Sequence, residues 1–150
     1  MHLFANRYQN NLPGQHIQND HLFRLHQITD QKHPYSYLRL SICYRKIGMS
    51  IRAQELMRQA IRKDKEVLNA VVRAGESQYA NEEYEKAIET YKSVVGFNRK
   101  MDPEIYWRVA LAHKKMKDVG KEVEYLERAV VASPDYEDAL QSLAEALNHR

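Results

Sequence analysis

Apolar residues recur at a helical spacing between residues 81 and 95, and polar residues fill the positions between them. The apolar positions lie three or four residues apart and are Tyr84, Ala87, Tyr91 and Val94. This is the period of one face of an amphipathic helix. Asn81 stands where its side chain can cap the start of such a helix. The pattern therefore predicts a helix over residues 82–95 that begins at an Asn81 cap.

The same spacing recurs upstream and downstream at steps of 34 or 35 residues. Ala87 matches Ala53 at a step of 34, and Tyr91 matches Leu126 at a step of 35. A second series precedes each of these helices and contains four pairs at the same steps: Leu40–Ser41, Ala74–Gly75, Val109–Ala110 and Leu143–Ala144. A period of this size predicts helix pairs that stack on one another.

Turn residues and cap residues divide the chain into seven expected helices. Their ranges are 34–47, 51–63, 66–80, 82–95, 103–117, 119–132 and 136–148. Gly48 and Gly96 are expected to end helices, as glycine commonly does. Caps are expected at Ser50, Asp102 and Asp118, since short polar side chains accept from free N–H groups at a helix start.

The two ends of the chain differ from the repeats between them. Residues 1–33 are expected to form an N-terminal arm or a capping helix. Residues 137–148 are expected to form an unpaired terminal helix with an apolar stripe of Leu140, Leu143 and Leu147. Its other side is polar, which suits the solvated outer face of a capping helix.

The pattern resembles the tetratricopeptide repeat family. The matching residues read Y-x-x-L-S-x-x-Y…A-x-x-x-M-x-x-A in Tyr37–Ala60 and Y-x-x-V-A-x-x-H…L-x-x-A…P in Tyr106–Pro134. The resemblance implies an all-α fold, a right-handed superhelical solenoid of stacked antiparallel helix pairs. The repeat domain would cover residues 34–150, with repeats at 34–67, 68–102 and 103–136. The chain departs from the family pattern where Gln78 and His113 replace a tyrosine and Glu122 replaces an alanine.

Composition agrees with a helical globular chain. Of the 150 residues, 43% are hydrophobic and 29% are charged, as in soluble globular domains. The single cysteine excludes an intrachain disulfide. No apolar run approaches the roughly 18 residues of a membrane span, and the N-terminus lacks the features of a signal peptide, so we expect a cytoplasmic protein. Residues 34–67 carry eight basic and three acidic residues, whereas the whole chain has a net charge of +3.

The sequence contains none of the common catalytic motifs. It has no phosphate-binding loop, no dinucleotide fingerprint and no nucleophile elbow. Five of the seven histidines lie in residues 1–33 without the spacing of metal ligands. We therefore expect no enzymatic activity, no cofactor, no metal and no small-molecule substrate.

Three arginines occupy the same place in successive repeats. Arg39, Arg73 and Arg108 each precede the large–small pair, at steps of 34 and 35. The family resemblance implies that the first helix of each pair lines a concave groove, where arginine can bind carboxylates in a bidentate manner. The full set of candidate partner-binding residues is Arg39, Ile42, Arg45, Arg73, Glu76, Trp107, Arg108, Lys114 and Lys115. An alternative is that Glu76 and Glu104 pair with the arginines inside the molecule.

These features favour a protein–protein interaction module or scaffold that binds an extended or helical, acidic segment of a partner protein. Ile42 stands where members that bind chaperone tails carry an asparagine, so the broader function is preferred. One alternative is a small secretion-type chaperone that holds an export substrate. Another is an RNA-binding helical-repeat protein, although the small residues at repeat positions make nucleic acid the less favoured partner.

Overall fold

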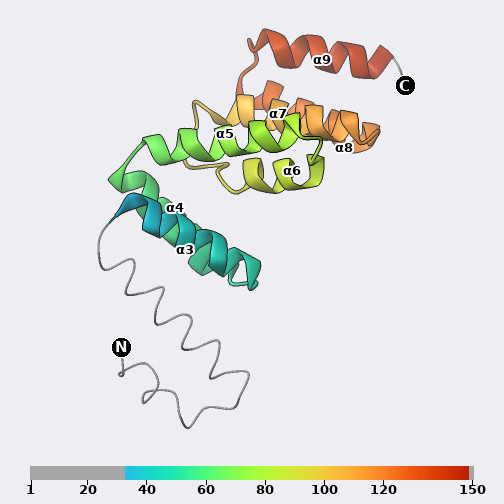
Figure 1. Ribbon diagram of the computed structural model, residues 1–150. Helices are drawn as coiled ribbons and strands as arrows, with labels where there is room; N and C mark the ends of the chain where they lie inside the picture. Colours follow the sequence, from blue (N-terminus) through green and yellow to red (C-terminus); the bar gives the residue numbers. More distant parts are fainter. Residues whose placement is uncertain (1–32, 149–150) are drawn as a thin grey trace, which may run out of the picture. The chain divides into compact units, whose positions relative to one another are not determined.

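The computed structural model describes residues 33–148 and divides the chain into two compact units, residues 1–67 and 68–150. The described residues form seven helices and no strand, as the repeat pattern predicts. In the first unit, α3 (Pro34–Lys46) and α4 (Ser50–Lys63) pack against each other as an antiparallel pair (Figure 1). The expected N-terminal arm or capping helix lies outside the described residues.

The core of the first pair combines apolar packing with one buried hydrogen bond. Its centre is formed by Leu40, Tyr44, Ala53 and Leu56. The hydroxyl of Ser41 donates to the carbonyl of Ala53 at 2.7 Å, inside the contact between α3 and α4. This bond satisfies the Ser41 hydroxyl, which is buried between the two helices.

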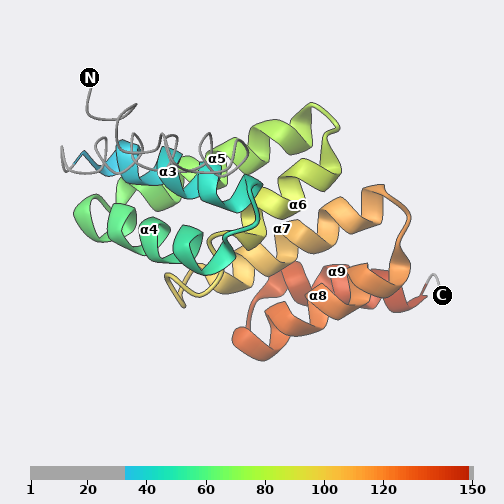
Figure 2. The same cartoon turned by 90° about the horizontal axis from the view of Figure 1, so that it is seen from below.

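The second unit holds the other helices in the predicted order. They are α5 (Glu66–Ala80), α6 (Tyr84–Lys92), α7 (Asp102–Lys115), α8 (Val119–Ala132) and α9 (Glu137–Asn148), and only the first two residues of α5 fall outside this unit. Helix α7 packs against α6 and α8, and α8 packs against α9. The paired helices α7 and α8 run antiparallel (Figure 2). Large buried side chains in this unit include Tyr91, Val94, Ile105, Val109 and Leu126.

The first helix of each pair ends in the same backbone turn. Gly48, Glu82 and Lys117 have positive φ values of 85°, 63° and 61°, and they follow one another at steps of 34 and 35. In each turn the next residue's N–H donates to a carbonyl five residues back, as from Met49 to Tyr44 at 2.9 Å. This is the Schellman arrangement, which satisfies carbonyls that a helix end leaves free.

These turns explain why two expected helix starts were wrong. Asn81 does not cap α6, because its N–H still donates to Ser77 and extends the end of α5. Helix α6 begins only at Tyr84, after the turn at Glu82. Ser50 is likewise the first residue of α4 and not its cap, since α4 starts directly after the turn at Gly48.

The other two expected caps have different outcomes. Asp118 caps α8 as predicted, and its carboxylate accepts from the backbone N–H of Lys121 at 3.2 Å. Asp102 is instead the first residue of α7, and its carboxylate accepts from the backbone N–H of Gly96 at 2.9 Å. Asp102 therefore fixes the loop between α6 and α7.

Helix α9 does not bury the predicted leucine stripe. Leu140 and Leu147 keep 40% and 50% of their surface exposed, whereas Ala139 and Ala146 are the buried residues of this helix. The prediction placed the three leucines opposite a polar outer side, and it was wrong for Leu140 and Leu147 because the two alanines occupy the buried positions of α9.

Candidate functional site

The three arginines of the predicted row lie on the first helices of their pairs. Arg39 lies on α3 in the first unit, while Arg73 and Arg108 lie on α5 and α7 in the second. Arg39 and Arg73 are exposed, and Arg108 is partly buried. The equal repeat positions thus carry arginines in two different environments.

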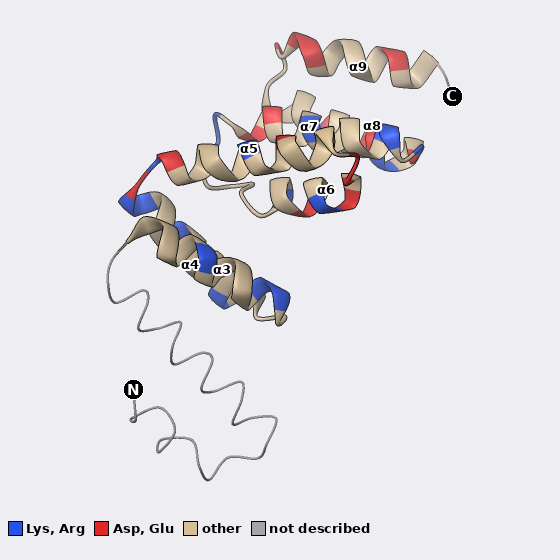
Figure 3. Cartoon of the chain, in the orientation of Figure 1, with Lys and Arg blue, Asp and Glu red and all other residues tan. Residues whose placement is uncertain are grey.

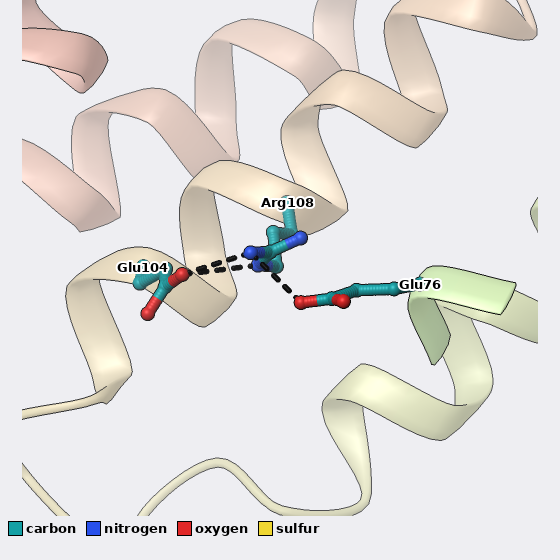
Figure 4. A network of polar contacts seen from close by, with 3 residues as sticks. All are labelled: Glu76, Glu104 and Arg108. Carbon is teal, nitrogen blue, oxygen red and sulfur yellow. Dashed lines mark hydrogen bonds and ion pairs between the residues drawn. The ribbon is translucent and has the colours of Figure 1, made fainter. Parts of the chain in front are cut away.

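Arg108 joins two carboxylates from different places in the second unit. Its Nη2 lies 2.9 Å from Glu104 Oε1, one turn earlier on α7, and 2.9 Å from Glu76 Oε1 on α5. Its Nε also donates to Glu104 at 3.3 Å. Figure 4 shows the guanidinium between the two carboxylates. The intramolecular pairing left open by the sequence therefore exists at Arg108, where it links α5 to α7.

The electrostatics of this cluster favour the charged arginine. Burial by itself lowers the pKa of Arg108, but the Glu104 hydrogen bond and the charges of Glu76 and Glu104 outweigh it and raise the pKa. Nearby, burial raises the pKa of the Tyr91 phenol, an effect that Arg108 partly offsets. One cation against two carboxylates leaves a net negative cluster, which is a poor place for an acidic ligand.

Arg39 and Arg73 have no such partners among the residues that the structure describes. Neither guanidinium forms a hydrogen bond or ion pair with any residue in the described range 33–148. Both side chains are exposed, so their donors face solvent. An exposed guanidinium without an internal partner keeps its five N–H donors available for a ligand.

Trp107 was expected to face a partner, but the structure also gives it an internal role. Its indole Nε1 donates to the hydroxyl of Ser142 on α9 at 3.0 Å. Its ring centre lies 6.1 Å from that of Tyr136, just before α9. The tryptophan therefore ties α7 to the terminal helix. The Tyr136 contact was not predicted, because this residue has no aromatic counterpart one repeat earlier.

The remaining candidates lie on the same two helices as Arg39 and Arg108. Ile42 and Arg45 are half-buried on α3, and Lys114 and Lys115 are exposed in the last turn of α7. Figure 3 shows basic residues along α3 and α4, whereas α9 carries only acidic ones within its described length. The positive charge predicted for residues 34–67 is thus concentrated on one helix pair.

Other kinds of site are not found in the described part of the chain. Residues 33–148 contain no group of histidine, cysteine or acidic side chains arranged to hold a metal ion. None of the helices α3 to α9 has the length and hydropathy needed to cross a bilayer.

Two segments match models of the tetratricopeptide repeat. Residues 69–96 match one such model and residues 103–136 match another. These ranges contain the pairs α5–α6 and α7–α8 almost completely. No curated protein sequence matches the chain.

Solved structures share this fold at low sequence identity. A crystal structure of MamA has 20% identity and a TM-score of 0.52, over 83% of this chain and 74% of that chain. The N-terminal domain of stress-induced protein-1 (STI-1) from C. elegans has 15% identity and a TM-score of 0.51, over 79% of this chain and 96% of its own. At these identities the likeness shows the fold and nothing further.

Proposed function

We propose, from the premise that this chain is a tetratricopeptide-repeat protein, that it binds an acidic segment of a partner protein through exposed arginines on the first helices of its pairs. Tetratricopeptide repeats are protein–protein interaction scaffolds, and non-catalytic modules are typical of this fold. The finer proposal concerns the chemistry of the bound segment. It depends on the contrast between Arg73 and Arg108, which occupy equal repeat positions.

The observation that carries the proposal is the exposed Arg73 on α5. The cluster at Arg108 uses its guanidinium to join two helices, so that arginine is committed to the fold. Arg73 is exposed and makes no comparable contact with the described residues. A cation that the fold does not use, at a position that repeats, is best explained by a ligand. Asp, Glu or a C-terminal carboxylate offers the matching bidentate acceptor.

The first unit supports the same chemistry independently. Arg39 occupies the equivalent position on α3 and is also exposed without an ion-pair partner among residues 33–148. Residues 34–67 carry eight basic and three acidic side chains. A surface of this charge attracts an acidic segment and speeds its association. Lys114 and Lys115 at the end of α7 add further exposed positive charge.

A displayed random-peptide library selected on the full chain tests the proposal. Enriched peptides should contain Asp, Glu or a free C-terminal carboxylate, and their affinity should be measured for the wild type, Arg39→Ala and Arg73→Ala. Losing one charge-assisted hydrogen-bond pair removes about 1.5–3 kcal/mol of binding free energy. Each change should therefore weaken peptide binding roughly ten- to a hundredfold.

The matched control is Lys86→Ala, an exposed cation on α6 that pairs with Glu83 at 2.9 Å. It should leave peptide affinity unchanged, because it lies on a second helix of a pair. Selection of neutral or basic peptides would refute the acidic partner. If Lys86→Ala lowers peptide affinity as much as the two arginine changes do, the effect is one of general charge and there is no defined site.

A further inference from the structure

Helix α9 keeps one apolar side open to solvent. Leu140 and Leu147 are largely exposed, and Ala144 between them is exposed as well. These three residues follow one another at steps of four and three, so they share one side of the helix. We call them the open stripe. The outer side of a terminal helix in a repeat protein is normally polar, so an apolar stripe at this place indicates a contact surface.

The same repeat positions are buried wherever a second helix covers them. Ala144 corresponds to Ser41 on α3 and to Ala110 on α7, which are 1% and 0% exposed. Leu147 corresponds to Tyr44 on α3, which is 1% exposed. In those pairs α4 packs against α3, and α8 packs against α7. Among the described residues no helix follows α9, and its stripe remains open.

Helix α9 stands in the place of the first helix of a further pair. It packs against α8 as α7 packs against α6. The indole of Trp107 donates to the hydroxyl of Ser142 at 3.0 Å and ties α9 to α7 as well. The pair α7–α8 therefore holds α9 in position without using the open stripe. Two large apolar residues with a small one between them are left free, in the register that contacts a second helix elsewhere in the chain.

The charge of α9 is entirely negative within its described length (Figure 3). Glu137, Asp138 and Glu145 are exposed, and none of them forms an ion pair with a residue in the part of the chain that the structure describes. Glu137 lies three residues before Leu140, which places it beside the open stripe. A segment that covers the stripe therefore gains from basic residues next to its own apolar face.

We propose that the open stripe of α9 binds a basic amphipathic helix of a partner protein, which takes the place of the second helix of a fourth pair. The chain's own second helices define the pattern of this ligand. In α4 a small, a large and a small residue follow at steps of four and three, and all three are buried: Ala53, Met57 and Ala60. A helix with this pattern lays its apolar face on a matching stripe. The site is separate from Arg39 and Arg73, and its ligand has the opposite charge.

Charge favours this ligand over a second copy of α9. Two α9 helices placed stripe to stripe would bring acidic side chains together, and their described lengths hold no basic residue to separate them. The register of the stripe also favours a helix over an extended segment. The equivalent positions Leu40, Ser41 and Tyr44 are buried in a pair of packed helices, where the small residue allows close approach.

A synthetic peptide of residues 49–64 with blocked ends tests the proposal, because it carries the α4 pattern with four basic and two acidic residues. Titration of the labelled peptide with the full chain, followed by fluorescence anisotropy, should show saturable binding. Leu147→Gln should weaken binding about fivefold, since it removes apolar surface that the peptide buries. Glu137→Gln should weaken binding about twofold, and added salt should weaken it further.

Ala144→Leu separates helix docking from general hydrophobic attraction. The change enlarges the apolar surface, but it places a large side chain where the covered pairs hold a small one. It should therefore weaken peptide binding about tenfold. The matched control is Val131→Gln, because Val131 on α8 is 81% exposed and lies outside the open stripe. This variant should bind the peptide as the wild type does.

Several results would overturn the proposal. Absence of peptide binding would do so, and so would tighter binding by Ala144→Leu. Equal affinities of Leu147→Gln and the wild type would show that the peptide binds elsewhere, for example to α3 in place of α4. A dimer of the full chain that dissociates on Leu147→Gln would assign the open stripe to a second copy of this chain instead.

Discussion

The ring of Tyr91 on α6 occupies the space that a β-carbon on Gly75 of α5 would need. A methyl group at Gly75 would lie 2.7 Å from Cδ1 of the ring and closer still to Cε1. Tyr91 is 1% exposed and cannot swing away into solvent. The absence of a side chain at Gly75 therefore sets how closely α5 and α6 approach, and it allows a large aromatic residue in their contact.

Gly75→Ala should lower the free energy of unfolding, although alanine is the better helix former. The helix preference favours alanine by about 1 kcal/mol, while overpacking costs about 1–3 kcal/mol, so we expect a net loss near 1 kcal/mol. Chemical denaturation measures it. In a Tyr91→Leu background the ring is gone, and Gly75→Ala should become neutral or stabilising.

Gly120 provides the control for this experiment. It also lies in a helix, but the nearest atom to an added β-carbon is the Asp118 carboxylate oxygen at an ordinary 3.8 Å. Gly120→Ala should therefore stabilise the chain. A stabilising Gly75→Ala in the wild-type background would show that α5 and α6 can separate without cost.

Glycine should be preferred at the turns that end α5 and α7. Glu82 and Lys117 hold φ values of 63° and 61°, a conformation that costs roughly 1–2 kcal/mol for a residue with a β-carbon. Gly48 fills the equivalent place in the first pair at no such cost. A glycine at Glu82 or Lys117 would remove this cost, although its greater conformational freedom in the unfolded chain offsets part of the stability gained.

Glu82→Gly and Lys117→Gly should therefore each raise the free energy of unfolding by about 0.5–1 kcal/mol. The control is Lys115→Gly, which places glycine two residues earlier, inside the last turn of α7, and should destabilise by about 1 kcal/mol. Thermal melts of the three variants compare them directly. Destabilisation by all three would contradict the proposed role of the positive φ.

His113 should make stability depend on pH below neutrality. Its ring stacks on Tyr125 with centres 5.7 Å apart, and its side chain is 14% exposed. Burial lowers its pKa below 6.5, while the charge of Asp118 opposes this shift and those of Lys121 and Lys92 support it. The unfolded chain then binds a proton more readily than the folded chain.

The contribution of neutral His113 to the free energy of unfolding is complete above the pKa of the unfolded chain, near 6.5. It is lost as the pH falls from there toward the lower pKa of the folded chain. His113→Phe keeps an aromatic ring against Tyr125 and removes the titration. Melting temperatures measured from pH 8 to 5 should fall less steeply for this variant than for the wild type. Identical pH profiles would show that His113 does not contribute.

The helices and their pairing could be predicted from the sequence, because the 34- and 35-residue steps repeat the residues that pack between helices. Ala87 illustrates this, being fully buried as its place in the pattern requires. The starts of α4, α6 and α7 could not be predicted by cap residues alone. The starts of α4 and α6 are set by the Schellman turns at Gly48 and Glu82, which satisfy carbonyls that the end of the preceding helix leaves free. The start of α7 lies at the loop contact between Asp102 and Gly96.

The candidate site was predictable only in part. Repeat position identifies Arg39, Arg73 and Arg108 as equivalent, and it cannot distinguish the paired Arg108 from the other two. That distinction depends on Glu76 and Glu104, which the α5–α7 contact brings to one guanidinium. Glu122 shows the same limit, since a glutamate at an alanine position is nonetheless buried, with 6% of its surface exposed.

Arg108 and Arg73 should separate stability from binding. Arg108→Met leaves Glu76 and Glu104 without their shared cation, so it should lower the free energy of unfolding. The arginine is 25% exposed and the carboxylates 43% and 45%, and solvent screens such pairs, so we expect about 1 kcal/mol. Adding Glu76→Gln should recover part of this loss by removing the carboxylate repulsion.

Arg73→Met should change the free energy of unfolding by less than about 0.5 kcal/mol. It should instead weaken the binding of the selected acidic peptides. Urea denaturation and peptide titration of the same variants measure both effects, and a stability loss from Arg73→Met equal to that from Arg108→Met would place Arg73 in the fold and remove it from the binding site.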